Sequence, residues 1–401
     1  MTSRSRGPSA GQAGSKRLAL VEFHTSRYIG GLTHTFYRYP ATTSPELVRE
    51  LLLGHTDADD LVLDPFMGGG TTVVEALAHG RLVVGGDLNS LAVFVTRAKT
   101  TPLTEPEWDE ISTWLKNEPL RARTIPFEDN GASTLPPFLH DPVARALAQT
   151  PLLRTTRQRT VVRCALLRTA QWALESSYLY PRRVDDRRNL APSPTQLAVR
   201  LTAALAEMRD GMQDLVDAAR EYGVLKGDLA GRRLLVKEAA EALRPAGKLA
   251  AIRRKVQLIL TSPPYPNVHV LYHRWQIEGR RETSAPYWIA GQADGATLSY
   301  YIMGSRTPFG QERYFERLQH AFAAVRPFLR RDGLVMQLVA FNRVDEQLPR
   351  YLAAMERAGY QPCHGRRGPT LVRDVPNRRW YARGKNLDAG REYLLVHAPV
   401  W

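Results

Sequence analysis

The sequence contains very little cysteine. Only two of its 401 residues are cysteines, Cys164 and Cys363, and they lie far apart in the chain. This number is too small for a zinc ribbon or a disulfide framework and fits a reducing compartment. Two histidines, His269 and His273, have i, i+4 spacing, but no glutamate or third ligand accompanies them. The sequence therefore predicts no metal site.

Long apolar runs are also missing. No uninterrupted run reaches the roughly 20 residues that a membrane-spanning helix needs, so we expect no membrane partner. Residues 1-17 are small, polar and basic, without the apolar segment of a secretory signal. We therefore expect a disordered basic arm over residues 1-17 and a cytoplasmic protein.

Acidic residues are outnumbered by basic ones. The chain has 55 Lys and Arg against 40 Asp and Glu, a formal net charge of +15, which favours a polyanionic partner. One arginine-rich segment, at 154–188, is also compatible with a solvated helix face. A second, "GRRGPTLVRDVPNRRWYARGKN", mixes basic and aromatic residues, as nucleic-acid-binding loops do. Its candidate nucleic-acid-binding residues are Arg366, Arg367, Arg378, Arg379, Arg383 and Lys385.

The chain has no GxxxxGK[ST] phosphate loop, which argues against a nucleoside triphosphate. Instead, "LVLDPFMGGGTT" predicts a strand at 61–65, a glycine-rich turn and a helix, followed by a second strand at 82–87. Asp87 ends that second strand, where a carboxylate can accept hydrogen bonds from ribose hydroxyls. This βαβ unit predicts a site for a nucleoside-containing cofactor that needs no phosphate cradle.

Further apolar runs predict the remaining strands, at 234–237, 256–260, 334–341 and 393–396. The spacing of apolar residues over 311–329 predicts a helix that Asp332-Gly333 ends. The pattern predicts an α/β fold, a Rossmann-like doubly wound sheet with an inserted helical subdomain. The expected organisation is a cofactor-binding half over 18-100, a helical insertion over 101-230, and a catalytic half over 231-401 with a basic C-terminal loop.

The strand at 256–260 runs into "TSPPY". Proline cannot donate a ladder hydrogen bond, so Pro263 and Pro264 end the strand in a rigid corner. Such a corner holds backbone carbonyls and side chains at fixed positions. That stiffness is useful where a substrate must be held still.

Together, "DPFMGGGTT", the acid of the second strand and "TSPPY" resemble the motifs of the amino-group DNA methyltransferases. These enzymes methylate cytosine N4 or adenine N6 with S-adenosylmethionine, so the resemblance implies a methyltransferase sheet, that cofactor and double-stranded DNA as partner. The family pattern is Asp-Pro-Phe-x-Gly-Ser-Gly-Thr-Thr, and Gly69 stands here in the serine position. Restriction or phage-defence components are candidate partners.

The resemblance also assigns site residues. The catalytic corner is Ser262, Pro263, Pro264 and Tyr265: the Ser262 hydroxyl and the Pro263 carbonyl accept from the target amine, and Tyr265 stacks on the flipped base. The segment "THTFYRYPATTSPELVRELL" is similar to the family's cofactor segment, and "LLVKEAAEAL" to its acidic third strand. The implied cofactor-binding residues are Tyr39, Pro40, Thr43, Asp64, Pro65, Phe66, Gly68, Gly70, Thr71, Thr72, Asp87, Asn89 and Glu238.

Several functions stay open. A serine before Pro-Pro-Tyr favours cytosine N4, since family members acting on adenine more often carry Asp or Asn there. Adenine N6 in DNA is the first alternative, and an exocyclic amine in RNA is the second. A recognition subunit that binds nucleic acid without turnover is the third, and the intact Asp87 and Ser262 argue against it.

Overall fold

The computed structural model describes a set of residue ranges, and every structural statement below refers to them. They are 31–40, 42–121, 135–177, 191–245, 249–250, 252, 254–266, 268, 270–271, 275, 284–292, 300–301, 303–305, 307–363, 371–374 and 391–401.

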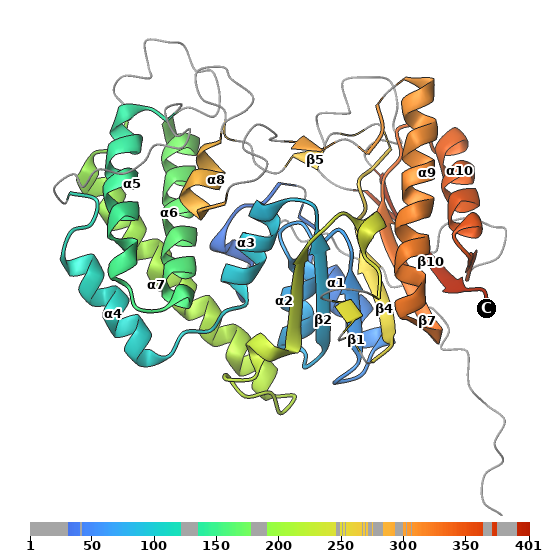
Figure 1. The fold of residues 1–401 in the computed structure, drawn as a ribbon, viewed down its shortest axis with the longest axis horizontal. Helices are drawn as coiled ribbons and strands as arrows, with labels where there is room; N and C mark the ends of the chain where they lie inside the picture. The colour runs from blue at the N-terminus through green and yellow to red at the C-terminus, as the bar shows by residue number, and fades with distance from the viewer. Residues whose placement is uncertain are drawn as a thin grey trace, which may run out of the picture.

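Within these residues, the centre of the molecule is an eight-stranded sheet (Figure 1). Its strands are β1 (Leu61–Asp64), β2 (Leu82–Asp87), β3 (Arg233–Lys237), β4 (Val256–Thr261), β7 (Leu329–Val339), β8 (Tyr360–Pro362), β9 (Leu371–Asp374) and β10 (Arg391–Pro399). The strand order is β3-β2-β1-β4-β7-β10-β8, and β9 pairs with β10. A separate pair is formed by β5 (Val270–Leu271) and β6 (Tyr300–Tyr301).

The strands β3, β2, β1, β4 and β7 are parallel, whereas β10 runs antiparallel between β7 and β8. Parallel neighbours require crossover connections, which the helices between them supply. This order confirms the predicted Rossmann-like doubly wound methyltransferase sheet. The strand order starts from β1 and extends to β3 on one side and β4 on the other. In such folds, ligands bind outside the carboxyl ends of the strands where the order reverses, which here is beside β1.

Helices cover both faces of the sheet. Alternating strand residues such as Val62 and Leu258 point into one core, against α1 (Pro45–His55), α2 (Thr71–Ala78) and α3 (Ser90–Lys99). The residues between them, such as Leu63 and Ile259, point into a second core. That core is completed by α9 (Pro308–Val325) and α10 (Val344–Arg357), and η6 (Ala240–Ala242) lies against α9. Because both faces are buried, the inner strands are apolar throughout rather than alternating.

Between β2 and β3 the chain forms a helical layer, which stands to the left of the sheet in Figure 1. It contains α4 (Glu105–Lys116), α5 (Pro137–Gln149), η3 (Thr150–Leu152), α6 (Thr156–Ser177), α7 (Pro194–Arg220) and η5 (Leu229–Arg232). Buried residues of these helices, including Leu166 and Met208, continue the first core. The short α8 (Ala285–Ala290), which follows β5 in the chain, packs in the same core. A role for this layer in target recognition stays a prediction.

The predicted end of the helix over 311–329 is wrong. Helix α9 ends at Val325, a 3-10 turn η8 (Arg326–Phe328) follows, and β7 begins at Leu329. Proline at 327 has no backbone N–H, so the α-helix does not continue through it. Asp332-Gly333 lies inside β7, where the pairing with β4 shifts register between Val256 and Leu258.

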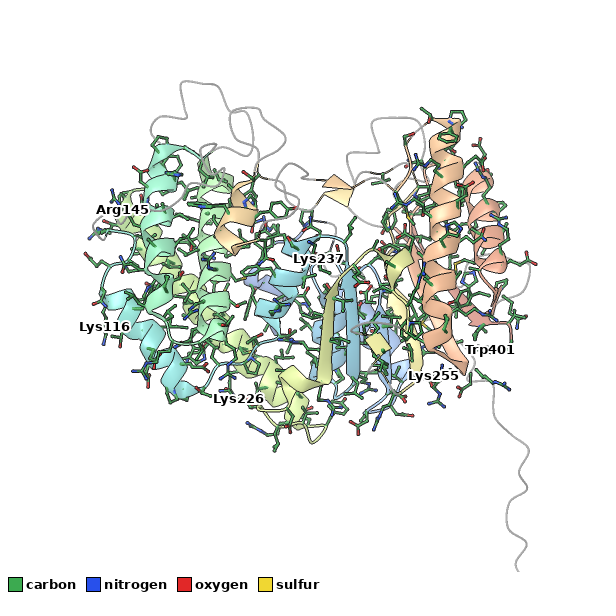
Figure 2. The ribbon with its side chains drawn as sticks, viewed as in Figure 1. Lys116, Arg145, Lys226, Lys237, Lys255 and Trp401 are labelled. Atoms are coloured by element: carbon green, nitrogen blue, oxygen red, sulfur yellow. The ribbon has the colours of Figure 1, made fainter. Side chains whose placement is uncertain are left out.

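Two labelled lysines in Figure 2 mark the amino edge of the sheet, where the parallel strands begin, and its carboxyl edge, where they end. Lys255, directly before β4, lies at the amino edge, whereas Lys237, the last residue of β3, lies at the carboxyl edge. Asp87 and Thr261 end their strands at the same carboxyl edge. None of the helices in the described ranges has both the length and the hydropathy that a bilayer crossing requires.

Candidate active site

The glycine turn between β1 and α2 is fastened to the end of β2. The Gly68 N–H donates to Asp87 Oδ2 (2.9 Å), and the Asn89 N–H donates to Asp87 Oδ1 (2.8 Å). A carboxylate can accept about four hydrogen bonds, so two acceptor positions remain for a ligand. Burial raises the pKa of Asp87 to about 6, against the opposing effect of these two N–H bonds.

Two of the three glycines leave no room for a side chain. A Cβ at Gly70 would lie 2.5 Å from Thr96 Oγ1, and Gly70 has a left-handed φ of 79°. A Cβ at Gly69 would lie 2.7 Å from the Cβ of Tyr39. Tyr39 therefore accounts for the glycine that stands here in the family's serine position.

A buried lysine at the end of α3 holds the backbone of the glycine turn. Lys99, at the end of α3, is 1% exposed, and its Nζ donates to the Gly69 carbonyl oxygen (2.8 Å). Burial lowers the pKa of this lysine to about 8. Together with Thr96, which lies one turn earlier on the helix, Lys99 fixes the backbone that a cofactor would approach.

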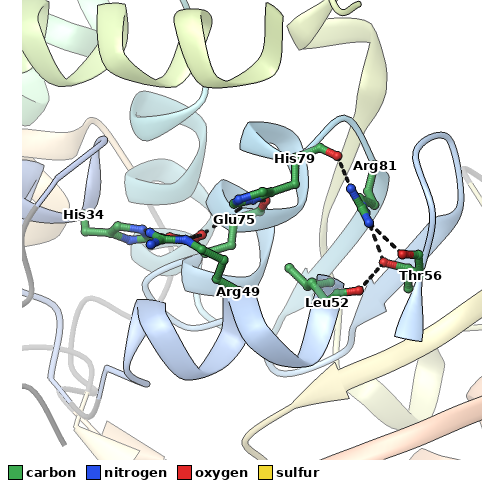
Figure 3. A network of polar contacts seen from close by, with 7 residues as sticks. All are labelled: His34, Arg49, Leu52, Thr56, Glu75, His79 and Arg81. Atoms are coloured by element: carbon green, nitrogen blue, oxygen red, sulfur yellow. Dashed lines mark hydrogen bonds and ion pairs between the residues drawn. The ribbon is translucent and has the colours of Figure 1, made fainter. Parts of the chain in front are cut away.

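The segment that carries Tyr39 is anchored by a buried polar network (Figure 3). Glu75 of α2 is fully buried and accepts from His34 Nε2 (2.7 Å) and Arg49 Nε (3.0 Å). Burial acts to raise the pKa of Glu75, but the bonds from His34 and Arg49 outweigh it and lower that pKa. This charge-paired network joins η1 (His34–Phe36), α1 and α2, and so fixes the position of the cofactor segment that follows η1.

One hydrogen bond links the strand that leads into the glycine turn to the strand that leads into the Ser-Pro-Pro-Tyr corner. The Thr261 hydroxyl, at the end of β4, donates to Asp64 Oδ1 (2.6 Å), which also accepts from the Phe66 N–H (3.1 Å). Asp64 is 4% exposed, and burial raises its pKa to about 6. The two motifs, nearly 200 residues apart, therefore meet at neighbouring strand ends.

The Ser-Pro-Pro-Tyr corner is held by contacts with β7 and α9. Ser262 Oγ lies 3.0 Å from the Leu338 carbonyl oxygen of β7 and 3.3 Å from Tyr265 Oη. The serine can donate its single proton to either of these oxygens. In both cases the lone pairs of Oγ stay available to accept a hydrogen bond from another group. The buried Tyr314 hydroxyl of α9 donates to the Pro264 carbonyl oxygen (2.8 Å), one residue beyond the Pro263 carbonyl assigned to the amine.

Tyr265 is fixed at its hydroxyl end. It donates to Glu392 Oε1 (2.7 Å), and its ring packs half-buried against the second core. Glu392 is 5% exposed and is the second residue of β10, which begins at the carboxyl edge because it runs antiparallel to its neighbours.

Four other predicted cofactor residues, Thr71, Thr72, Asn89 and Glu238, lie at the same edge. Thr71 and Thr72 are buried in the first turn of α2, whereas Glu238 is exposed and its N–H donates to the Asp87 carbonyl oxygen. Asn89 caps α3, since its Oδ1 accepts from the N–H of Leu91 (2.8 Å), and its Nδ2 donates to the Tyr287 hydroxyl of α8. The remaining predicted residues are Pro40, Thr43 and Pro65, of which Pro65 directly follows β1. Direct contact of these residues with a cofactor stays a prediction.

The predicted nucleic-acid-binding residues are not among those that the structure describes. They are Arg366, Arg367, Arg378, Arg379, Arg383 and Lys385. The histidines His269 and His273 also lie outside the described residues.

Sequence reasoning missed three residues of this site: Lys99, Tyr314 and Glu392. Lys99 is the last residue of a helix that is almost entirely buried, so its charge on an apolar segment was the available signal. Glu392 directly precedes the apolar run 393–396. In the sequence it therefore looks like an ordinary polar residue at the start of a buried strand. Tyr314 fits the apolar face of α9 and carries no signal of its own.

The sheet order, with a glycine turn bound to the carboxylate that ends the second strand, is consistent with a Rossmann-like methyltransferase fold. Residues 19–95 match the family N6_N4_Mtase, described as DNA methylase. This match confirms the resemblance to the amino-group DNA methyltransferases that the motifs indicated.

Two type II methyltransferases match parts of the chain. The chain is 37% identical over 112 residues to the type II methyltransferase M.MvaI of Kocuria varians, covering 27% of this chain and 24% of that protein. It is 32% identical over 66 residues to the type II methyltransferase M.MjaII of Methanocaldococcus jannaschii, covering 16% and 12%. The chain thus matches about a quarter or less of the length of these two relatives.

A solved structure aligns over most of the chain but loosely. The rRNA methyltransferase aviRa from Streptomyces viridochromogenes is 8% identical, with a TM-score of 0.34, over 92% of this chain and 90% of that one. At this TM-score the likeness supports no conclusion about activity.

Gly70→Ala tests the close packing of the turn. We expect it to lower the free energy of unfolding by about 2 to 4 kcal/mol, because the left-handed φ and the contact with Thr96 both oppose a Cβ. Urea denaturation measures this change. Gly54→Ala, in the exposed part of α1 with no atom within 4 Å of a Cβ, is the control and should be neutral or slightly stabilising. Equal stability of the two variants would contradict the packing described for Gly70.

Proposed function

We propose that the chain is an S-adenosylmethionine-dependent DNA methyltransferase that methylates the exocyclic amine of a flipped base, with cytosine N4 as the favoured target. The observation that carries this proposal is the bond between Thr261 and Asp64. It joins the end of β4, where the Ser-Pro-Pro-Tyr corner starts, to the end of β1, where the glycine turn starts. A cofactor over the turn and a base at the corner would therefore be neighbours.

The residues around the turn fit a nucleoside cofactor. Gly68 and Gly70 have positive φ angles of 49° and 79°, a backbone conformation that glycine adopts without strain. Asp87 would accept hydrogen bonds from the ribose hydroxyls, and Glu238, at the end of the next strand, would lie toward the adenine. The bound cofactor would supply a methyl group made electrophilic by its sulfonium.

The corner fits the needs of an exocyclic amine. Such an amine is a poor nucleophile because its lone pair is delocalised into the ring. Acceptors at the Ser262 hydroxyl and the Pro263 carbonyl would bind both N–H groups and bias the nitrogen toward a pyramidal geometry. Because the prolines and Tyr314 hold the corner rigid, this stabilisation needs no reorganisation during the reaction.

A base inside a duplex cannot reach this corner. It must be flipped out, at a cost of a few kcal/mol for unpairing and unstacking. Stacking on Tyr265 would offset part of that cost, and the bond from Tyr265 to Glu392 keeps the ring in place before the base arrives.

The decisive experiment is sequencing of DNA from cells that express the chain, read with a method that distinguishes N4-methylcytosine from N6-methyladenine. We expect N4-methylcytosine at one recurrent sequence, and N6-methyladenine would support the first alternative. Mass spectrometry of nucleosides from RNA of the same cells tests the second alternative. Unmodified DNA and RNA, combined with DNA binding by the purified protein, would leave the recognition subunit.

The basic C-terminal segment is proposed to contact DNA phosphates. Replacing both Arg378 and Arg379 by glutamate should weaken binding to all DNA sequences and flatten its salt dependence by roughly one unit of slope per lost phosphate contact. Fluorescence anisotropy at several salt concentrations measures the slope. Charge reversal of Arg220, an exposed residue at the end of α7, is the control. A slope that does not change would place Arg378 and Arg379 away from the DNA backbone.

A further inference from the structure

A line of hydrogen-bonding groups leads from the catalytic corner to a buried carboxylate. Ser262 Oγ lies 3.3 Å from Tyr265 Oη, and Tyr265 Oη donates to Glu392 Oε1 at 2.7 Å. The three residues come from the end of β4, the loop after it and the start of β10. Glu392 is 5% exposed, so the far end of this line is largely shielded from water.

Methylation of an amine creates a proton that must leave. As the amine nitrogen forms its bond to the methyl carbon, the carbon–sulfur bond breaks and its electron pair stays on sulfur. The nitrogen then carries a positive charge and two protons, of which one must be lost to give the neutral methylamine. The corner itself contains a serine, two prolines and a tyrosine, none of which is a carboxylate.

We propose that Glu392 is the acceptor of this proton, which reaches it through the hydroxyls of Ser262 and Tyr265. The inference rests on the proposed amino-methyltransferase function and assigns a role to a residue in the last strand of the sheet.

The transfer balances without any further reactant. The methylated nitrogen gives a proton to Ser262 Oγ while the serine proton passes to Tyr265 Oη and the tyrosine proton passes to Glu392. Both hydroxyls end neutral, as they began, and Glu392 becomes a carboxylic acid that returns its proton to solvent after product release. The 3.3 Å separation between the hydroxyls is long for proton transfer, but such distances commonly shorten when substrate binds.

The charges around Glu392 are compatible with this role. Tyr265 faces it from the corner, and Tyr314 lies near Tyr265, with a pKa that burial raises well above its ordinary value. Arg391 precedes it on β10. Tyrosine titrates well above pH 8, so neither of these tyrosines accounts for a change of rate between pH 5 and 8.

Glu392→Gln separates proton acceptance from positioning. The glutamine amide oxygen can still accept from the Tyr265 hydroxyl, but the side chain cannot take up a proton. We expect single-turnover methylation of duplex DNA to fall by about 10²-fold, with unchanged affinity for S-adenosylhomocysteine and for DNA. With saturating cofactor, the wild-type rate should fall as the pH drops toward 5, and this fall should be lost in Glu392→Gln.

A second variant and a control complete the test. Tyr265→Phe keeps the ring but breaks the line of hydroxyls, so it should lose a similar factor, and the double variant should be no slower than the worse single one. Glu346→Gln, an exposed carboxylate on α10, should match the wild type. If Glu392→Gln does not fold, as judged by loss of cofactor binding, the rate of Tyr265→Phe decides whether the proton passes through the Tyr265 hydroxyl.

Two results would overturn the proposed proton transfer to Glu392. One is a Glu392→Gln or Tyr265→Phe enzyme with the wild-type rate, which would mean that the contact is structural. The other is a slow Glu392→Gln enzyme that keeps the wild-type pH profile, which would assign that profile to Asp64 instead. Failure of the proposed function looks different, because the wild-type chain would then transfer no methyl group to DNA.

Discussion

Replacing Ser262 by alanine is expected to lower the single-turnover rate of methyl transfer by roughly 10²- to 10³-fold, the usual loss when one preorganised transition-state hydrogen bond is removed. The Ser262 proton is directed at Leu338 or Tyr265, so the oxygen presents lone pairs to the target amine. Alanine removes that acceptor and leaves the glycine turn untouched. Binding of cofactor and DNA should therefore survive.

The control for this prediction is Ser112→Ala. Ser112 is exposed on α4, and its Oγ donates to a backbone carbonyl, that of Trp108 (2.9 Å), much as Ser262 does to Leu338. Its removal should leave the rate unchanged. Rapid-quench measurement with saturating cofactor and DNA compares the variants. A Ser262→Ala enzyme with an undiminished rate would mean that the corner only ends a strand, and the acceptors of the amine would have to lie elsewhere.

Asp87→Ala is expected to weaken binding of S-adenosylhomocysteine by about 10²- to 10⁴-fold. Two hydrogen bonds from ribose hydroxyls to a carboxylate would contribute about 1.5 to 3 kcal/mol each. The same change also removes the acceptor for the N–H groups of Gly68 and Asn89, which loosens the turn itself. Isothermal titration calorimetry measures the affinity. Asp214→Ala, an exposed residue on α7, is the matched control and should bind as the wild type does.

The raised pKa of Asp87 also predicts how cofactor affinity depends on pH. Ribose hydroxyls need the ionised carboxylate, so affinity should fall as the pH drops below about 6. Folding stability responds with the opposite sign. Because the pKa of Asp87 lies higher in the folded protein than in the unfolded chain, ionisation destabilises the fold, and the contribution improves as the pH falls from about 6 toward 4. An affinity that is constant from pH 8 to pH 5 would contradict a ribose contact at Asp87.

The sequence alone determined the features that depend on neighbouring residues. The turn at Gly68 to Gly70 follows from the conformational freedom of glycine, and the corner at Pro263 and Pro264 follows from the missing N–H of proline. Buried parallel strands are short apolar runs, so β1, β2 and β4 were predicted almost to their ends. The doubly wound fold then followed, because parallel neighbours need helical crossovers.

Only the tertiary structure decided the contacts between distant segments. Nothing near Glu392 in the chain indicates that β10 runs antiparallel, yet this direction brings the residue to the carboxyl edge beside Tyr265, 127 positions away. The bond from Lys99 to Gly69 and the packing of Tyr39 on that glycine likewise depend on how helices dock on the sheet. Local patterns determine where a strand or turn begins and ends. Which strands and helices lie next to it depends on the packing of the whole core. That packing depends on the size and burial of residues far apart in the chain.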